Sequence, residues 1–164
     1  QGTLSCAPSD KIIPLTSNKT TLNNAVDAFS ANGMTAGHLG TAWAWYMISP
    51  NWQNVWPVGN KPENYGPNVI KVAVLLTDGD YNTYYRNSTS SQDQAAQLCS
   101  GMKQGNNIIV FTVGFGTGMS QASKDFLKAC ATDADHYFDA TDGDALRAAF
   151  RSIAFTITQL RLTK

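Results

Sequence analysis

The sequence carries little charge and no long apolar run. Charged residues make up 15% of the 164 residues, and 12 Lys and Arg balance 12 Asp and Glu. A neutral chain has no electrostatic reason to bind a nucleic acid backbone or an anionic lipid surface. No apolar run approaches the roughly 20 residues that a membrane-spanning helix needs. Nor does a signal peptide open the chain, and we expect residues 1–3 to be an internal or processed start.

Cysteine is also scarce, with only Cys6, Cys99 and Cys130 and no CxxC spacing. A structural zinc site needs four ligands, and only His38 and His136 could add to this set. The count therefore argues against structural zinc. Two readings stay open on composition alone: one disulfide with the third cysteine paired outside the chain, or three buried thiols.

The composition that remains is typical of one folded domain spanning residues 1–164. Hydrophobic residues make up 43% of the chain, and this length can bury a sizeable core. Two helices are predicted in the first third. One begins behind Thr20 as its N-cap and closes at Gly33, and the other runs from about 36 to 48 and stops at Ser49-Pro50.

A long surface loop follows at residues 50–68. It holds four of the six prolines and two of the four tryptophans. Loops of this length are often functional, and amphipathic tryptophans are common anchors at protein interfaces. Trp52 and Trp56 are therefore candidates for exposed contacts with a partner.

Strands and helices alternate in the rest of the chain. Residues 69–76 are nearly all apolar and rich in valine and isoleucine, which predicts a strand covered on both faces. Two further strands are predicted at 107–114 and 136–139, and helices follow the three strands from Ser90 or Ser91, from Ser120 and from about Asp142. This order predicts right-handed βαβ units, a mostly parallel sheet and a three-layer α/β fold.

Two polar segments should meet at the carboxyl ends of these strands, where open parallel sheets bind ligands. Thr77-Asp78-Gly79-Asp80 follows the first strand, and Thr35 stands on the turn into the second helix. A threonine hydroxyl and a carboxylate are hard oxygen ligands, suited to Mg²⁺, Mn²⁺ or Ca²⁺. Read without any family, the same residues also fit a plain turn and a helix N-cap.

The order of Thr35, a helix, Leu75-Leu76-Thr77-Asp78-Gly79 and then residues 109–116 (IVFTVGFG) resembles the later part of a von Willebrand factor A-type domain. In that family a metal ion-dependent adhesion site takes an aspartate and two serines from a DxSxS segment, with a threonine and an aspartate from two further loops. The resemblance implies that Thr35 and Asp78 are metal ligands, with Thr77 and Asp80 supporting them.

No DxSxS segment occurs in the chain, and the nearest piece, residues 5–10, has the wrong spacing. The resemblance implies that the first, central strand and its DxSxS loop are missing here, which leaves the 69–76 strand with an open edge. Either the intact protein carries them upstream or the metal site is lost. We expect the chain to bind Mg²⁺, Mn²⁺ or Ca²⁺ only if an upstream segment supplies the DxSxS ligands.

A closer resemblance involves residues 6–8, 13–16 and 35–45 (TAGHLGTAWAW), Ser49-Pro50, and the ending at 149–154 and 160–164. These segments resemble the C-terminal end of TadG-type pilus assembly proteins of bacterial tight-adherence (Flp) systems. Such proteins typically carry a membrane anchor upstream. The resemblance implies a periplasmic or extracellular domain, a pilus or envelope protein as partner, and a Cys99–Cys130 disulfide with Cys6 free or paired upstream.

The predicted function is therefore protein binding through a partial adhesion site rather than catalysis. One alternative is a structural domain that binds no metal. The other is a metal-dependent hydrolase at the same strand ends, which would need a base or nucleophile, and only Asp80 is available there. His38 and His136 lack a GxSxG serine, so we expect them on a helix surface and at a strand end.

Overall fold

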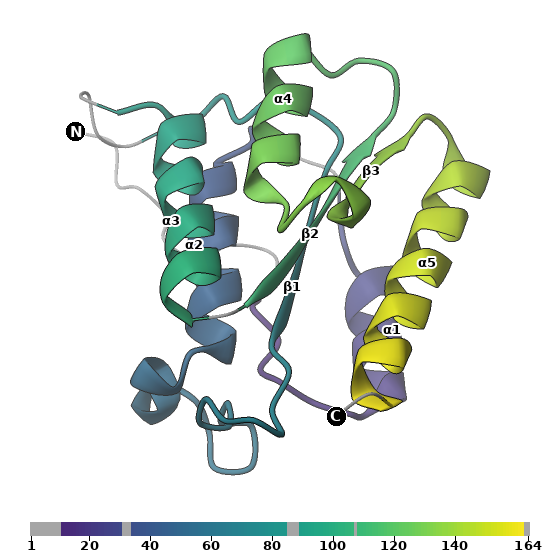
Figure 1. Cartoon of the computed structure of the whole chain (residues 1–164). Helices are drawn as coiled ribbons and strands as arrows, with labels where there is room; N and C mark the ends of the chain where they lie inside the picture. The colour runs from purple at the N-terminus through teal and green to yellow at the C-terminus, as the bar shows by residue number, and fades with distance from the viewer. Residues whose placement is uncertain (1–10, 31–33, 85–88, 107, 163–164) are drawn as a thin grey trace.

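The computed structural model describes residues 11–30, 34–84, 89–106 and 108–162 of the chain. Within them, three strands form one open sheet in the order β1-β2-β3, and both neighbouring pairs are parallel. The strands are β1 (Val72–Thr77), β2 (Ile109–Phe115) and β3 (Tyr137–Ala140). Helices lie on both sides of the sheet, which gives three layers (Figure 1). The predicted three-layer α/β fold with a parallel sheet is confirmed.

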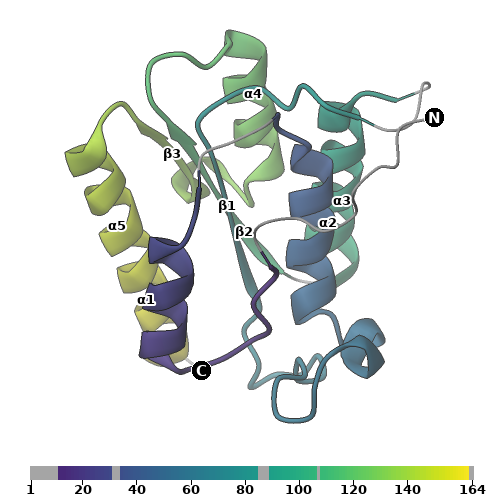
Figure 2. The ribbon, with the colours of Figure 1, turned by 180° about the vertical axis from the view of Figure 1, so that it is seen from behind.

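Helices connect the strands in the predicted order. Those described are α1 (Lys19–Asp27), α2 (Gly37–Ile48), α3 (Ser91–Asn106), α4 (Gln121–Cys130) and α5 (Gly143–Leu162), with short 3-10 helices η1 (Pro50–Val55) and η2 (Ala134–His136). The pair α2 and α3 packs on one face of the sheet together with α4, and α5 covers the other face (Figure 1 and Figure 2). None of the described helices combines the length and apolar character of a membrane span.

The first helix differs from its prediction at its beginning. Asn18, not Thr20, is the N-cap, because its side-chain oxygen accepts the Thr21 N–H at 3.0 Å. The helix ends at Asp27, and Gly33, predicted to close it, lies outside the described residues. Ser120 caps α4 as expected, accepting the Ser123 N–H at 3.2 Å.

Burial differs between the two longer strands. All five central residues of β2 are buried, as a strand with helices on both faces requires. In β1 buried and exposed residues alternate, and Val74 and Leu76 are 36% and 49% exposed. The prediction that this strand is covered on both faces is wrong for the described part of the chain. The reason is that α5 packs over β2 and β3 and leaves the outer half of the β1 face uncovered.

The long loop is anchored at both of its ends. Trp56 is only 8% exposed, and its indole N–H donates to the Tyr46 carbonyl at 3.1 Å. The expectation that Trp56 is an exposed contact is therefore wrong, because the loop folds back against α2, whereas Trp52 remains 36% exposed. The buried Lys71 ammonium donates to the carbonyls of Ile48, at 2.8 Å, and Glu63, at 2.6 Å.

A disulfide joins two of the helices. Cys99 of α3 and Cys130 of α4 form a disulfide between residues 31 apart in sequence, and both are buried in the core. Cys6 lies outside the described residues.

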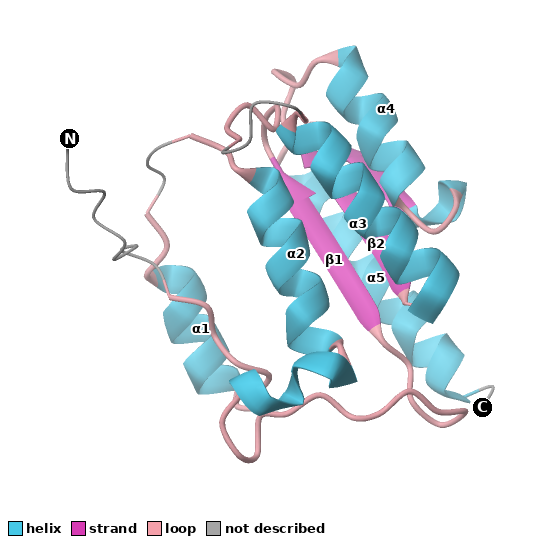
Figure 3. Ribbon diagram, turned by 90° about the vertical axis from the view of Figure 1, so that its left-hand side faces the viewer, coloured by secondary structure: helices cyan, strands magenta, loops and turns pink. Residues whose placement is uncertain are grey.

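Helix α1 has no buried residue, although Leu22, Val26 and Phe29 follow a helical spacing. Figure 3 shows α1 apart from α2 and α3, and Figure 1 and Figure 2 show it on the α5 side of the sheet.

Candidate functional site at the carboxyl edge of the sheet

The carboxyl ends of the three parallel strands lie at one edge of the sheet, at the upper end in Figure 1. The loop that follows β1, residues 78–84, and the turn into α2, residues 34–36, meet at this edge. They come from parts of the chain more than 40 residues apart, so only the fold brings them together.

Thr35 is hydrogen-bonded to the loop that follows β1. Its N–H donates to the Asn82 side-chain oxygen at 3.0 Å, and its carbonyl accepts the N–H groups of Asn82 and Thr83, each at 3.1 Å. All three bonds use the Thr35 backbone. The backbone position of the threonine is therefore set by the loop that also carries Asp78.

Asp78 is presented by the turn that ends β1. The buried Thr77 hydroxyl donates to the Gly79 carbonyl at 2.9 Å and accepts the Gly79 N–H at 3.3 Å, which folds the chain tightly around Asp78. Asp78 itself is exposed. Within the described residues, neither its carboxylate nor the Thr35 hydroxyl takes part in a hydrogen bond or ion pair. The two predicted ligands thus share one rim, and their oxygens are not used elsewhere.

Asp80 connects the same loop to α4. Its carboxylate accepts the Ser120 hydroxyl at 2.9 Å and the Ser120 N–H at 3.3 Å. Hydrogen bonds from the side chains of Ser123 and Ser120 lower the pKa of Asp80. Asp80 thus supports the loop from the side of α4, at the N-terminus of that helix, where a negative charge is favoured.

Tyr81 was not singled out by the sequence, and it fixes the other side of the loop. Its ring lies so close to Gly37, the first residue of α2, that a Cβ there would collide with it. The ring also packs against Phe126 of α4, with ring centroids 5.2 Å apart. Burial raises the pKa of Tyr81. Asn82 was missed as well, since no local pattern pairs a side chain with a backbone 47 residues away.

A groove runs along the open edge of β1. It has a volume of about 250 Å³ and lies between residues 74–77 of the strand and the facing side of α2. That side of α2 carries small residues, namely Gly37, Gly40, Thr41 and Ala44. Small side chains leave room for another backbone to come close.

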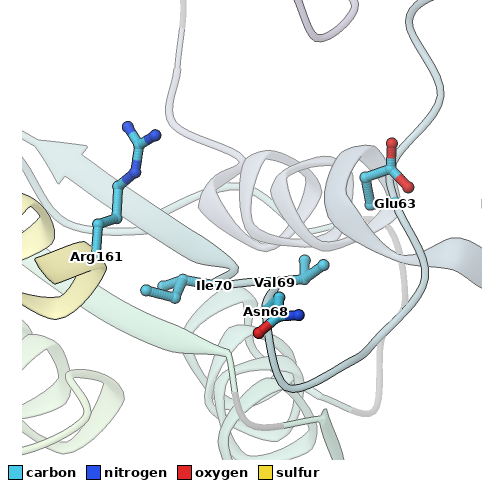
Figure 4. A pocket seen from close by; sticks show the side chains of 5 residues that line it. All are labelled: Glu63, Asn68, Val69, Ile70 and Arg161. Atoms are coloured by element: carbon cyan, nitrogen blue, oxygen red, sulfur yellow. The ribbon is translucent and has the colours of Figure 1, made fainter. Parts of the chain in front are cut away.

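A second hollow lies at the opposite, amino end of β1. It has a volume of about 390 Å³, and Figure 4 shows Glu63 and Arg161 on its two sides with Val69 and Ile70 between them. Ligands of open parallel sheets bind at the carboxyl ends of the strands, so the rim that carries Thr35 and Asp78 is the better candidate site.

The rim carries oxygen groups of the kind that bind metal ions. A hydroxyl and a carboxylate fit a hard divalent cation, which prefers about six oxygen ligands. Among the described residues no group of three or more His, Cys, Asp or Glu side chains is placed to hold a metal. The donors present therefore fit such an ion in kind but supply only a fraction of its ligands.

An open parallel sheet with polar loops at its carboxyl edge belongs to the class of α/β domains that bind ligands at strand ends. Within that class, residues 8–152 match the von Willebrand factor type A domain. The chain belongs to this family. No curated protein sequence matches it.

Solved structures share the fold at low sequence identity. Proximal thread matrix protein 1 from the mussel byssus is 23% identical over 82% of this chain, with a TM-score of 0.53. The pilus adhesin SpaC from Lactobacillus rhamnosus GG is 16% identical over 87% of this chain, with a TM-score of 0.61. A structure of the mussel protein with a zinc-occupied MIDAS motif is 21% identical over 85%, with a TM-score of 0.54. The matched regions span 28%, 21% and 30% of these three chains.

Proposed function

We propose that this chain is the later part of a protein-binding A-type domain, in which Thr35 and Asp78 supply two ligands of a metal ion-dependent adhesion site. The main support is the set of hydrogen bonds between the Thr35 backbone and residues 82–83. These bonds hold the loop that carries Thr35 against the loop that carries Asp78. The Thr35 hydroxyl and the Asp78 carboxylate make no hydrogen bond or ion pair among the described residues, and their loops meet at one rim. Oxygen ligands of this kind suit Mg²⁺ or Mn²⁺, and Ca²⁺ less closely.

The remaining ligands would come from a strand upstream of this chain. Three observations support this step. No other strand pairs with the outer edge of β1 among the described residues, Val74 and Leu76 of β1 are exposed, and the facing side of α2 carries small residues. A parallel strand added there would end at the same rim, where a DxSxS segment would bring an aspartate and two serines. It would also remove the exposed edge, which is otherwise prone to aggregation.

Binding rather than catalysis is the better supported activity. His38 does pair with a serine, since its Nδ1 lies 2.8 Å from the Ser91 hydroxyl. Both residues are buried, however, and Ser91 is 0% exposed, so this serine cannot reach a substrate. The expectation that His38 lies on the helix surface is wrong for the same reason. In our proposal a carboxylate of a partner protein completes the shell of the ion.

We place the domain in the bacterial envelope, on its periplasmic or extracellular face, in a TadG-like pilus assembly protein anchored to the membrane upstream. The buried disulfide supports an oxidising compartment. The similarity of fold to a pilus adhesin is compatible with this role.

The test is calorimetric titration with Mg²⁺ and Mn²⁺ of a longer protein that includes the upstream region. Asp78→Ala and Thr35→Ala should each abolish or strongly weaken binding of the ion. Asp125→Ala is the matched control, because it removes an exposed carboxylate on α4 and should leave the titration unchanged. Undiminished metal binding by Asp78→Ala would rule out the proposed site, and metal-dependent turnover in an activity screen would favour the hydrolase instead.

A further inference from the structure

A groove of about 420 Å³ lies between α2 and α3, apart from the rim. Its walls include Leu39, Ala42 and Tyr46 of α2 and Gln94, Gln97 and Leu98 of α3. The two helices pack side by side, as Figure 1 and Figure 3 show. The groove thus lies on a rigid helical layer that the disulfide between α3 and α4 reinforces.

Among the described residues that line this groove there is no Asp, Glu, Lys or Arg. Its polar groups are two side-chain amides, a threonine, a tyrosine and the imidazole of His38, whose Nδ1 is held by Ser91. Such a surface offers hydrogen-bond donors and acceptors without a formal charge. It therefore suits an uncharged ligand with hydroxyl groups better than a phosphate, a carboxylate or a cation.

An ordered aromatic cluster adjoins the groove at Tyr46. Tyr46, which lines it, stacks on Trp52 with ring centroids 3.9 Å apart and planes 19° apart. Trp43 meets Tyr46 edge-on at 5.7 Å, and the buried Trp56 is bonded to the Tyr46 carbonyl. With one face against Tyr46 and 36% of its surface exposed, Trp52 presents an immobilised indole to solvent.

We propose that this groove binds a neutral saccharide of one or two pyranose rings. A pyranose has a face of C–H groups, which packs on an aromatic ring, and a rim of hydroxyls, each both donor and acceptor. The ring of Tyr46, held in place by its stacking on Trp52, matches the first feature. The amide of Gln97 matches the second, together with the side-chain oxygen of Gln94, whose amide nitrogen donates to the Thr89 carbonyl at 2.9 Å. The volume lies in the range of about 300–1,000 Å³ typical of small-ligand sites.

The experiment uses the 164-residue chain and a panel of disaccharides in NMR titrations. The neutral probes are cellobiose, maltose, lactose and N,N′-diacetylchitobiose, and digalacturonate is the charged comparator. We expect saturable binding of at least one neutral probe, with shifts confined to amides of α2, α3 and η1, and weaker or no binding of digalacturonate. Trp52→Ala and Gln97→Ala should each raise the Kd at least about tenfold.

Gln97 is exposed and takes part in no hydrogen bond or ion pair with the described residues, so its variant keeps the test informative even if Trp52→Ala unfolds. Phe155→Ala is the matched control, because it removes another exposed aromatic ring, on α5. Its Kd should equal that of the wild type. Failure of every neutral probe to bind, or binding that both groove variants leave unchanged, would overturn the proposal. So would binding of a decaproline peptide without any saccharide, which would assign the groove to a protein partner.

Discussion

β1 and β2 have nearly the same apolar composition, yet they differ in how many of their side chains are buried. The central residues of β2 are buried on both faces, with Phe111 and Val113 0% exposed, whereas β1 buries one face and leaves Val74 and Leu76 accessible. The strands are neighbours in register, with Val74 beside Phe111 and Leu76 beside Val113. The difference therefore comes from what covers each strand, since α5 packs over β2 and β3 and the outer half of β1 has no such cover among the described residues.

β1 is thus apolar on both faces, but only one face is covered by the described residues. The polar rim lies at the border between the covered and the open half of this sheet. Its loop follows β1, on the open side, but is held by α2 and α4, which belong to the covered side. The predictions below test whether the two halves differ in stability and whether the covered half holds the rim.

The largest effect is expected at the centre of β2. Phe111→Ala should lower the free energy of unfolding by about 3–5 kcal/mol, because it removes a fully buried ring and leaves a cavity. Leu76→Ala in β1 should cost less than about 1 kcal/mol in this chain, since that side chain is half exposed. Urea unfolding of both variants measures the difference. Equal losses would mean that β1 is already covered on both faces in solution.

The secondary structure was largely predictable from the sequence because it depends on local patterns. The predicted strands at 69–76 and 107–114 overlap β1 and β2 and end one residue before them, and the predicted helix at 36–48 matches α2. The exposure of Val74 was not predictable, because the cover of each face of a strand depends on helices distant in sequence, and α5 packs over β2 and β3.

The site was predictable only in part. The sequence named Thr35 and Asp78 through a family resemblance, and the structure brings their loops together, but whether they bind metal remains a prediction. Asn82 is hydrogen-bonded to Thr35, and the Tyr81 ring packs against Gly37. Both contacts join segments that are distant in sequence, so no local periodicity predicts them. Trp56 was misjudged because tryptophans in a polar loop look exposed until the loop folds back on a helix.

The next largest effect is expected where the rim loop meets α2. Gly37→Ala should destabilise the chain by about 1–3 kcal/mol, because its methyl group would displace the Tyr81 ring. Gly40→Ala, one helical turn later, meets no atom within 4 Å and should stabilise the helix by about 0.5–1 kcal/mol. Thermal unfolding of the two variants tests their opposite signs. If Gly37→Ala stabilised the chain as Gly40→Ala does, the packing of Tyr81 would not hold the loop.

The smallest effect is expected where the rim loop meets α4, and it depends on pH. Hydrogen bonds from Ser123 and Ser120 lower the pKa of Asp80, so the folded chain favours its carboxylate more than the unfolded chain does. The resulting stability is complete above the unfolded pKa of about 3.9 and is lost as the pH falls through the lower folded value. The difference in unfolding free energy between wild type and Asp80→Asn should therefore be constant near neutral pH and shrink below about pH 4.

Denaturant unfolding at a series of pH values measures this difference, and the Ser120→Ala/Ser123→Ala background supplies the control. Without the two hydroxyls, Asp80 loses the side-chain donors that lower its pKa. Replacing Asp80 by Asn in this background should therefore change the pH dependence of the unfolding free energy at acid pH much less. The same shrinkage in both backgrounds would show that the carboxylate acts through another partner. The rim loop would then be held to the covered half of the sheet by Tyr81 and not by α4.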